Sequence, residues 1–303
     1  MRSLPYLGLL LGLWSALGSA GSPQQVEPTP IISVKTLLVT LPVTVVDRRG
    51  RPVSGLRQED FTVYDSGEPV AIQFFTSEDL PATIGLVIDS SGSMRGRRQD
   101  VTTAAAAFAD ISHPLDEFFT LNFNEAVWPG LRPPVVFTED MDELYAALSE
   151  APAQGMTALY DAVDRGHDHL QLGSRDRKAL IVVSDGGDNA STHTLDEVLE
   201  HARGTSAVIY SVTLVDPADH DAKPGLLKKL ARESGGRSFA PGRPDDVMSA
   251  FAEIAREIRS GYVMAFQPPD TGGSSFRPVQ VVARAADDRQ LIVRTRAGYY
   301  AGR

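Results

Sequence analysis

The sequence predicts an α/β protein in which a doubly wound, mostly parallel sheet is inserted into a small, discontinuous antiparallel β domain. Three observations favour this fold class. Apolar and polar residues alternate from Lys35 to about Phe75 and again after Gly261, which is the period of β-strands. Between these segments, short apolar runs alternate with stretches whose apolar residues lie three and four positions apart, as in helices. Strands that alternate with helices form a parallel sheet with helices on both faces.

Length and composition exclude several classes of function. The chain has 303 residues, which favours about two domains at roughly 150 residues each. Lys and Arg total 29 against 39 Asp and Glu, so the formal charge is 29 − 39 = −10. This charge excludes a nucleic-acid binder that works by general phosphate attraction, because such binding needs a basic surface. There is no cysteine, which excludes disulfides, thiolate zinc sites, cysteine nucleophiles and thioether lipid anchors.

The first 20 residues have the layout of a secretory signal peptide. A basic residue, Arg2, precedes a short apolar run, and small residues up to Ala20 form a cleavage site. We expect cleavage after Ala20 and export to the periplasm or the extracellular space. The alternative is an uncleaved membrane anchor, but the apolar run is shorter than the roughly 20 residues that span a bilayer. No later segment is apolar enough to span one, and we expect residues 21–33, which are polar and Pro-rich, to be a flexible lead-in.

The predicted β domain combines residues 34–80 with residues 260–303. In the first segment, alternate apolar residues from Val39 to Val45 share one face, and Gly50 and Gly67 mark turns. The second segment shows the same period of two. Because a few short strands are only marginally stable alone, we expect the two segments to pair into one sandwich-like domain.

The inserted α/β domain is predicted over residues 81–259. Its buried strands are expected at residues 84–88, 118–123, 179–183 and 208–215. The helices between them carry the residues typical of helix ends. Thr194 and Glu197 form a capping box, Pro244 lies in a first turn, and Gly235 can close a helix.

Three oxygen-rich loops contain the residues suited to chemistry. Asp89, Ser91 and Ser93 follow one buried strand at alternate positions, and Asp185 follows another. Thr157 lies just before a helix. In open α/β sheets, the loops at the carboxyl ends of the strands form the ligand crevice. Two carboxylates and three hydroxyls, without His or Cys, suit Mg²⁺, Mn²⁺ or Ca²⁺ rather than zinc or copper.

The run D-x-S-x-S after a hydrophobic strand, a later G-x-T and a later S-D-G resemble the von Willebrand factor type A (VWA) domain. This resemblance implies a Rossmann-like sheet and a metal-ion-dependent adhesion site. Its ligands would be Asp89, Ser91, Ser93, Thr157 and Asp185, with Mg²⁺ as the expected ion and Mn²⁺ or Ca²⁺ as alternatives. One coordination position would stay open for an acidic side chain of a partner protein. The flanking segments also resemble a group of secreted bacterial proteins that carry this domain.

Weaker signals have simpler explanations. Asp89 to Ser93 alone could be an N-capping loop. His167 and His169 are two positions apart on a predicted helix and point to different sides, so we expect surface or core-edge histidines rather than a metal pair. We expect Asn189, in a glycosylation sequon, to shape the Asp185 loop instead. Two further groups remain: an acidic loop that we expect to be solvated (Asp216, Asp219, His220, Asp221) and a basic group that either steers an acidic partner or solvates a helix (Arg95, Arg97, Arg98).

Three classes of function are compatible with these residues. The leading hypothesis is a secreted, non-enzymatic protein that binds a protein ligand through the divalent ion. The alternative is a non-catalytic scaffold of a cell-envelope assembly that uses metal-independent contacts. A metal-dependent hydrolase is disfavoured, because both carboxylates of the site are assigned as ligands and no general base remains beside them.

Overall fold

The computed structural model describes residues 38–149, 153–214, 223–269, 275–285 and 290–301. The predicted signal peptide, the lead-in and the acidic loop at residues 216–221 lie outside these ranges. Within them, no helix is both long enough and apolar enough to cross a membrane.

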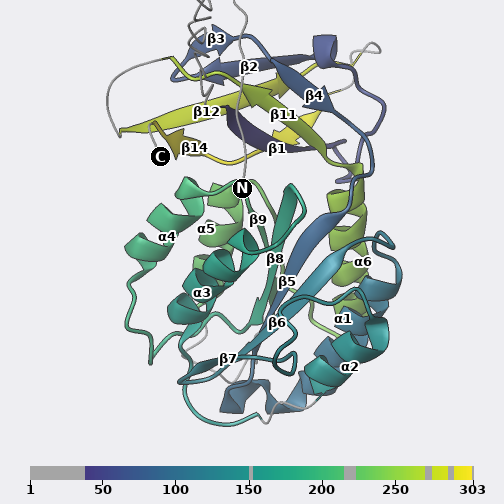
Figure 1. Ribbon diagram of the computed structural model, residues 1–303, viewed down its shortest axis with the longest axis vertical. Helices are drawn as coiled ribbons and strands as arrows, with labels where there is room; N and C mark the ends of the chain where they lie inside the picture. The colour runs from purple at the N-terminus through teal and green to yellow at the C-terminus, as the bar shows by residue number, and fades with distance from the viewer. Residues whose placement is uncertain (1–37, 150–152, 215–222, 270–274, 286–289, 302–303) are drawn as a thin grey trace, which may run out of the picture. The chain divides into compact units, whose positions relative to one another are not determined.

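A six-stranded sheet forms the centre of the α/β region (Figure 1). Its strand order is β10-β9-β8-β5-β6-β7, and every neighbouring pair is parallel except β6 with β7. The strands are β5 (Ala82–Asp89), β6 (Glu117–Phe123), β7 (Val127–Pro129), β8 (Arg177–Ser184), β9 (Val208–Thr213) and β10 (Ser238–Phe239). All eight residues of β5 are buried, as expected for a central strand that is covered on both faces. The predicted α/β fold class is confirmed.

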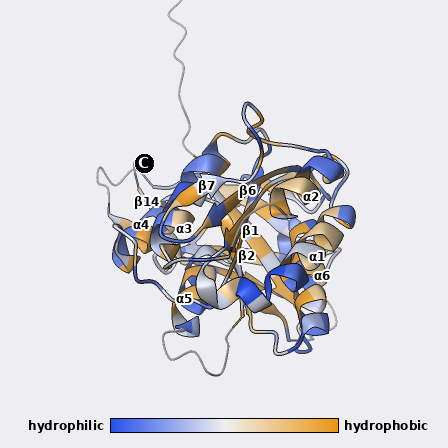
Figure 2. Ribbon diagram, turned by 90° about the horizontal axis from the view of Figure 1, so that it is seen from below, coloured by the Kyte–Doolittle hydropathy of each residue, from blue (hydrophilic) through white to orange (hydrophobic). Residues whose placement is uncertain are grey.

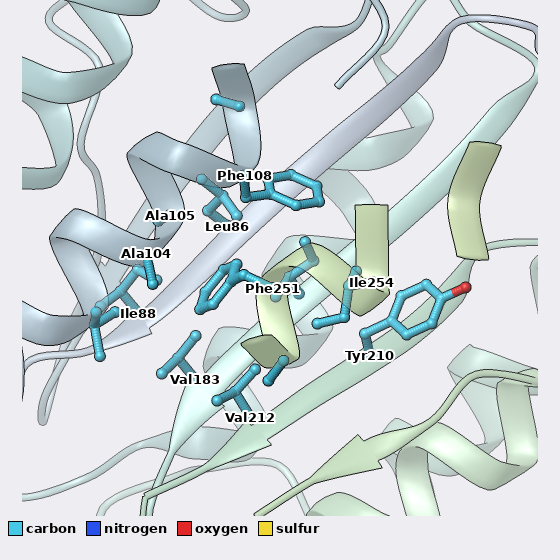
Figure 3. Close-up of a cluster of buried hydrophobic side chains, with 14 of the residues drawn as sticks. Leu86, Ile88, Ala104, Ala105, Phe108, Val183, Tyr210, Val212, Phe251 and Ile254 are labelled. Carbon is cyan, nitrogen blue, oxygen red and sulfur yellow. The ribbon is translucent and has the colours of Figure 1, made fainter. Parts of the chain in front are cut away.

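Within the described residues, six helices cover the two faces of this sheet. They are α1 (Arg98–Asp110), α2 (Met141–Ser149), α3 (Leu159–Gln171), α4 (Leu195–Gly204), α5 (Pro224–Ser234) and α6 (Pro244–Ser260). The first face packs against α1, α2 and α6, where Leu86 of β5 lies among Phe108 and Phe251 (Figure 3). The second packs against α3, α4 and α5, where Val87 contacts a separate cluster. These helices carry both hydrophilic and hydrophobic residues (Figure 2), as expected for amphipathic helices that cover a sheet.

The predicted helix ends are confirmed. The Thr194 hydroxyl accepts a hydrogen bond from Glu197 N (3.4 Å), and the Glu197 carboxylate accepts one from Thr194 N (2.7 Å). Pro244 begins α6. Gly235 ends α5 with φ +87°, and a Cβ there would lie 2.5 Å from the backbone carbon of Thr295. Glycine is therefore required both by the left-handed conformation and by the close approach of another segment.

Strands from the two ends of the chain pair with each other in two antiparallel sheets. Their orders are β13-β1-β11-β4 and β14-β12-β2-β3. The strands are β1 (Val39–Val46), β2 (Phe61–Asp65), β3 (Glu68–Val70), β4 (Phe74–Thr76), β11 (Tyr262–Phe266), β12 (Phe276–Ala283), β13 (Ile292–Arg294) and β14 (Gly298–Tyr300). Leu41 of β1 pairs with Met264, and Val63 of β2 pairs with Val281. All four side chains belong to one core. Residues 37–303 form one compact unit, so the domain boundaries drawn from the sequence stay predictions.

Candidate functional site

Two neighbouring parallel strands bring the predicted metal-ligand loops together. Asp89 is the last residue of β5, and Asp185 directly follows β8. The two strands pair up to Ile88 with Val183, so both aspartates lie at the same edge of the sheet. Ser91 and Ser93 belong to the turn that leads through a short 3-10 helix (Gly92–Gly96) into α1. Thr157 lies in the loop that precedes α3.

A continuous set of hydrogen bonds connects four of the predicted ligands. Asp89 Oδ1 accepts from Ser91 N at 2.8 Å. The hydroxyl oxygens of Ser91 and Ser93 are 3.1 Å apart, and Ser93 Oγ donates to Asp185 Oδ2 at 2.5 Å. Ser91 is the N-cap of the short 3-10 helix but makes no side-chain capping hydrogen bond. Its hydroxyl contacts Ser93 instead, which differs from the simple capping interpretation of this loop.

Backbone contacts place Thr157 beside the other two loops. Thr157 N donates to Asn189 Oδ1 at 2.8 Å, and Thr157 O accepts from Asn189 N at 2.9 Å. Gly92 N donates to Gly155 O at 3.2 Å. The Thr157 loop is therefore bonded to both the Asp89 loop and the Asp185 loop. Asn189 shapes the site as expected, since its side chain is engaged by Thr157.

Burial makes the site electrostatically unfavourable when it carries no cation. Asp89 is 1% exposed, and burial raises its pKa to about 6, with a smaller contribution from the Asp185 carboxylate. Hydrogen bonds from Ser184 Oγ (2.6 Å) and Ser91 oppose this rise by favouring the ionised form. The two carboxylates at this edge of the sheet attract a positive charge, and the Asp185 carboxylate adds to the raised pKa of Asp89.

The donor set fits a hard divalent cation. All five candidate side chains offer oxygen, and Asp89, Ser91, Thr157 and Asp185 are buried while Ser93 is exposed. In the part of the chain that the structure describes, no group of three or more His, Asp or Glu side chains could hold a metal ion. The candidate set contains only two such residues and relies on hydroxyls for the rest.

Several residues at this edge were missed by the sequence analysis. Ser184 Oγ orients Asp89, as described above. Asn124 and Glu125, which follow β6, hold the Thr157 loop. Asn124 Nδ2 donates to Gln154 O (3.1 Å), and Glu125 Oε2 accepts from Met156 N (2.9 Å). Asn124 and Glu125 directly follow β6, which pairs with β5 on the side opposite β8. This position after a strand next to β5 is the signal that could have identified them.

Two of the arginines after the Asp89 loop bind neighbouring loops. Arg95 donates to Ala153 O (3.2 Å), and Arg98 donates to Ser90 Oγ (2.9 Å) and to Leu148 O (3.1 Å). These guanidinium groups therefore hold the rim of the site in place. The sequence suggested that these arginines steer an acidic partner or solvate a helix. It did not suggest that they hold neighbouring loops.

The two histidines of α3 point to different sides of the helix, as predicted. His169 stacks on Phe119 with ring centroids 4.2 Å apart, while His167 lies 5.2 Å from the ring of His201 on α4. The expectation of a surface or core-edge position is wrong for His167, which is fully buried. It lies on the face of α3 that packs against α4.

The six-stranded sheet, its helices on both faces and the oxygen-rich edge define the class of fold. The chain has the fold of a von Willebrand factor type A domain, as the sequence resemblance predicted. Additional antiparallel sheets accompany it.

Comparisons with known proteins agree with this assignment. No family model matches the sequence. A von Willebrand factor type A structure from Catenulispora acidiphila is similar with a TM-score of 0.53 and 15% identity, covering 88% of this chain and 74% of that one. Proximal thread matrix protein 1 of the mussel byssus is similar with a TM-score of 0.50 and 14% identity, covering 64% and 51%.

One curated relative is similar in sequence over part of the chain. Over 166 residues, the sequence is 26% identical to inter-alpha-trypsin inhibitor heavy chain H4 of Sus scrofa. The match covers 52% of this chain but spans only 18% of that relative's length. The similarity to solved structures therefore establishes the fold, and function has to be argued from the site.

Proposed function

We propose that this protein is a secreted, non-enzymatic binding protein that captures a protein ligand through a divalent ion. Asp89, Ser91, Ser93, Thr157 and Asp185 would hold the ion. The VWA fold suggests protein–protein interaction or adhesion. The observation that carries the proposal is the set of hydrogen bonds from Asp89 through Ser91 and Ser93 to Asp185, which joins the loops after two adjacent strands.

Mg²⁺ is the proposed ion, with Mn²⁺ and Ca²⁺ as alternatives of the same oxygen preference. A bound dication would supply a Lewis-acidic position for an acidic side chain of the partner. Two carboxylates balance the formal charge of the dication and the hydroxyl ligands add none, so an open coordination position on the ion, rather than a net positive charge, would accept the partner's acidic side chain. Ser93 is exposed whereas Asp89 and Ser91 are buried, so the partner would approach from the side of Ser93.

Export follows in this proposal from the N-terminal sequence, which resembles a signal peptide. A non-enzymatic role is proposed because the two carboxylates of the candidate site would serve as ligands, and both also accept hydrogen bonds, Asp89 from Ser184 Oγ and Asp185 from Gly187 N.

The first test is the melting temperature of the purified protein in chelator and in Mg²⁺, Mn²⁺ or Ca²⁺. An ion at 100 times its dissociation constant adds about 2.7 kcal/mol of stability, which corresponds to roughly 5–10 °C for a domain of this size. The variant Asp89→Ala and the double variant Ser91→Ala with Ser93→Ala should lose this shift. Ser249→Ala, which removes a hydroxyl on the surface of α6, should keep it.

The second test is capture of an immobilised acidic peptide in Mg²⁺ and in chelator. Capture that requires the ion and Asp89 supports the proposal. A native protein whose melting temperature no divalent ion changes contradicts it. Capture of a native partner that survives Asp89→Ala would favour the alternative of a metal-independent scaffold.

A further inference from the structure

The loop that carries Thr157 is fixed by partners at consecutive backbone groups. Gln154 N donates to Ser90 O (2.8 Å), and Gln154 O accepts from Asn124 Nδ2. Gly155 O accepts from Gly92 N (3.2 Å). Met156 N donates to Glu125, Thr157 N donates to Asn189, and Ala158 N donates to Asn124 O (2.6 Å). The orientation of Thr157 is therefore set by contacts to all the neighbouring loops.

Glu125 makes the charged contact in this set. Its Oε2 lies 2.9 Å from Met156 N, the amide directly before Thr157. A hydrogen bond to a carboxylate is roughly twice as strong as one between neutral groups. The side chain is exposed, in the turn between β6 and β7, so it contributes little to the hydrophobic core. Its contact with the loop is the part of its environment that requires an acceptor oxygen.

Gly155 is shaped to admit this carboxylate. Its φ is +88°, a conformation that residues with a side chain rarely adopt. A Cβ at this position would lie 1.9 Å from Glu125 Oε2 and 2.8 Å from Glu125 Cδ. The glycine thus leaves the space that the Glu125 carboxylate occupies against the loop backbone. The Glu125 carboxylate thus fits the space beside Gly155. A solvated surface glutamate would not need such a fit.

We infer that Glu125 is a positioning residue for the proposed ion site, acting through the backbone of Gly155 and Met156 on Thr157. This inference rests on the proposed function, because it assigns the site a supporting residue outside the ligand set. Groups that orient metal ligands from outside the coordination sphere change metal affinity about 10- to 100-fold when they are replaced. Glu125 acts as a hydrogen-bond acceptor in this role, so its charge is less important than its oxygen.

The test measures Mn²⁺ and Mg²⁺ affinity by calorimetry, together with the melting temperature in chelator. Glu125→Ala should weaken ion binding about 10-fold or more while leaving the chelator melting temperature nearly unchanged. Glu125→Gln keeps an acceptor oxygen and should retain affinity close to the native value. The control Glu197→Ala removes an exposed glutamate that accepts from a backbone amide at the start of α4. It should lower stability without changing ion affinity.

A double-mutant cycle tests the contact itself. Gly155→Ala places a Cβ where the carboxylate lies and should weaken ion binding in the native background. It should weaken binding less in the Glu125→Ala background, where part of the contact is already lost. Additive effects would contradict the proposed contact between these two residues.

The outcomes separate this inference from the proposed function. If the native protein binds the ion and Glu125→Ala binds it equally well, only the inference is overturned. If Glu125→Gln loses as much affinity as Glu125→Ala, charge rather than acceptance is responsible and the positioning role is wrong. If the native protein binds no divalent ion, the proposed function fails and the inference fails with it.

Discussion

His167 makes the stability of the protein depend on pH in a predictable direction. Its side chain is fully buried on α3, and burial lowers its pKa to about 3, with a smaller lowering by His201 and an opposing effect of Asp164. In the unfolded chain, a histidine has a pKa of about 6.5. Below that value the unfolded state binds a proton that the native state does not, so the free energy of unfolding falls as pH falls.

The size of this effect follows from the interval between the two pKa values. From pH 6.5 to pH 5.0, one group that titrates only in the unfolded state removes about 1.36 kcal/mol per pH unit, or about 2 kcal/mol in total. Asp89 acts in the opposite direction, because its raised pKa lets the native state bind a proton below about 6. His193 also opposes it, since hydrogen bonding to Asp161 raises its pKa. The His167 contribution therefore has to be isolated by substitution.

The assay is urea denaturation of the native protein and of His167→Gln at pH 7.5 and pH 5.0 in chelator. The substitution should destabilise the protein at pH 7.5, because it disturbs a packed position. This destabilisation should shrink by about 2 kcal/mol at pH 5.0, since the variant no longer has a group that the unfolded state protonates. The control Val163→Ala shortens another fully buried side chain of α3 and should cost the same at both pH values. An equal cost of His167→Gln at both pH values would refute the reasoning.

Three further substitutions have defined expectations. Asp89→Asn should stabilise the ion-free protein at pH 7.5 by about 1–2 kcal/mol. The raised pKa of Asp89 corresponds to a cost of about 3 kcal/mol for keeping its carboxylate ionised, and the substitution loses one hydrogen-bond acceptor worth about 1 kcal/mol. A melting temperature in chelator that does not rise contradicts this. Gly85→Ala would place a Cβ 2.3 Å from the Phe119 ring and should cost about 1–3 kcal/mol by overpacking, measured by urea denaturation. Thr194→Ala removes the cap of α4 and should cost about 1 kcal/mol; a cost below the error of that assay would show that the cap is dispensable.

The fold was predictable from local patterns because its central strands are buried on both faces. Apolar runs at residues 84–88 and 179–183 correspond to β5 and β8, which extend one or two residues further at each end. The two-residue strand β10 was missed, because it is too short to show a period. Pairing of β1 with β11 could be expected only from the marginal stability of the separate segments.

The candidate site was only partly accessible to sequence reasoning. Asp89 and Asp185 stand out because each is an acidic residue at the end of an apolar run that predicts a buried strand. Asn124 and Glu125 also follow a strand, but their partners lie about 30 residues away. Nothing local shows which carbonyl Asn124 donates to or which amide Glu125 accepts from. The burial of His167 was missed for the same reason, since it depends on how α3 and α4 pack.

The pairing of β1 with β11 has a consequence for the order in which the chain folds. The contact of Val43 with Tyr262 closes a loop of 262 − 43 = 219 residues, and the entropic cost of such a closure in a flexible chain is about 5 kcal/mol. Once residues 82–260 have folded, β4 and β11 emerge from them as adjacent strands, with Thr76 beside Val263. The remaining distance to close is then short. We therefore expect the six-stranded sheet to act as the template on which the distant ends of the polypeptide meet, and the antiparallel sheets to form last.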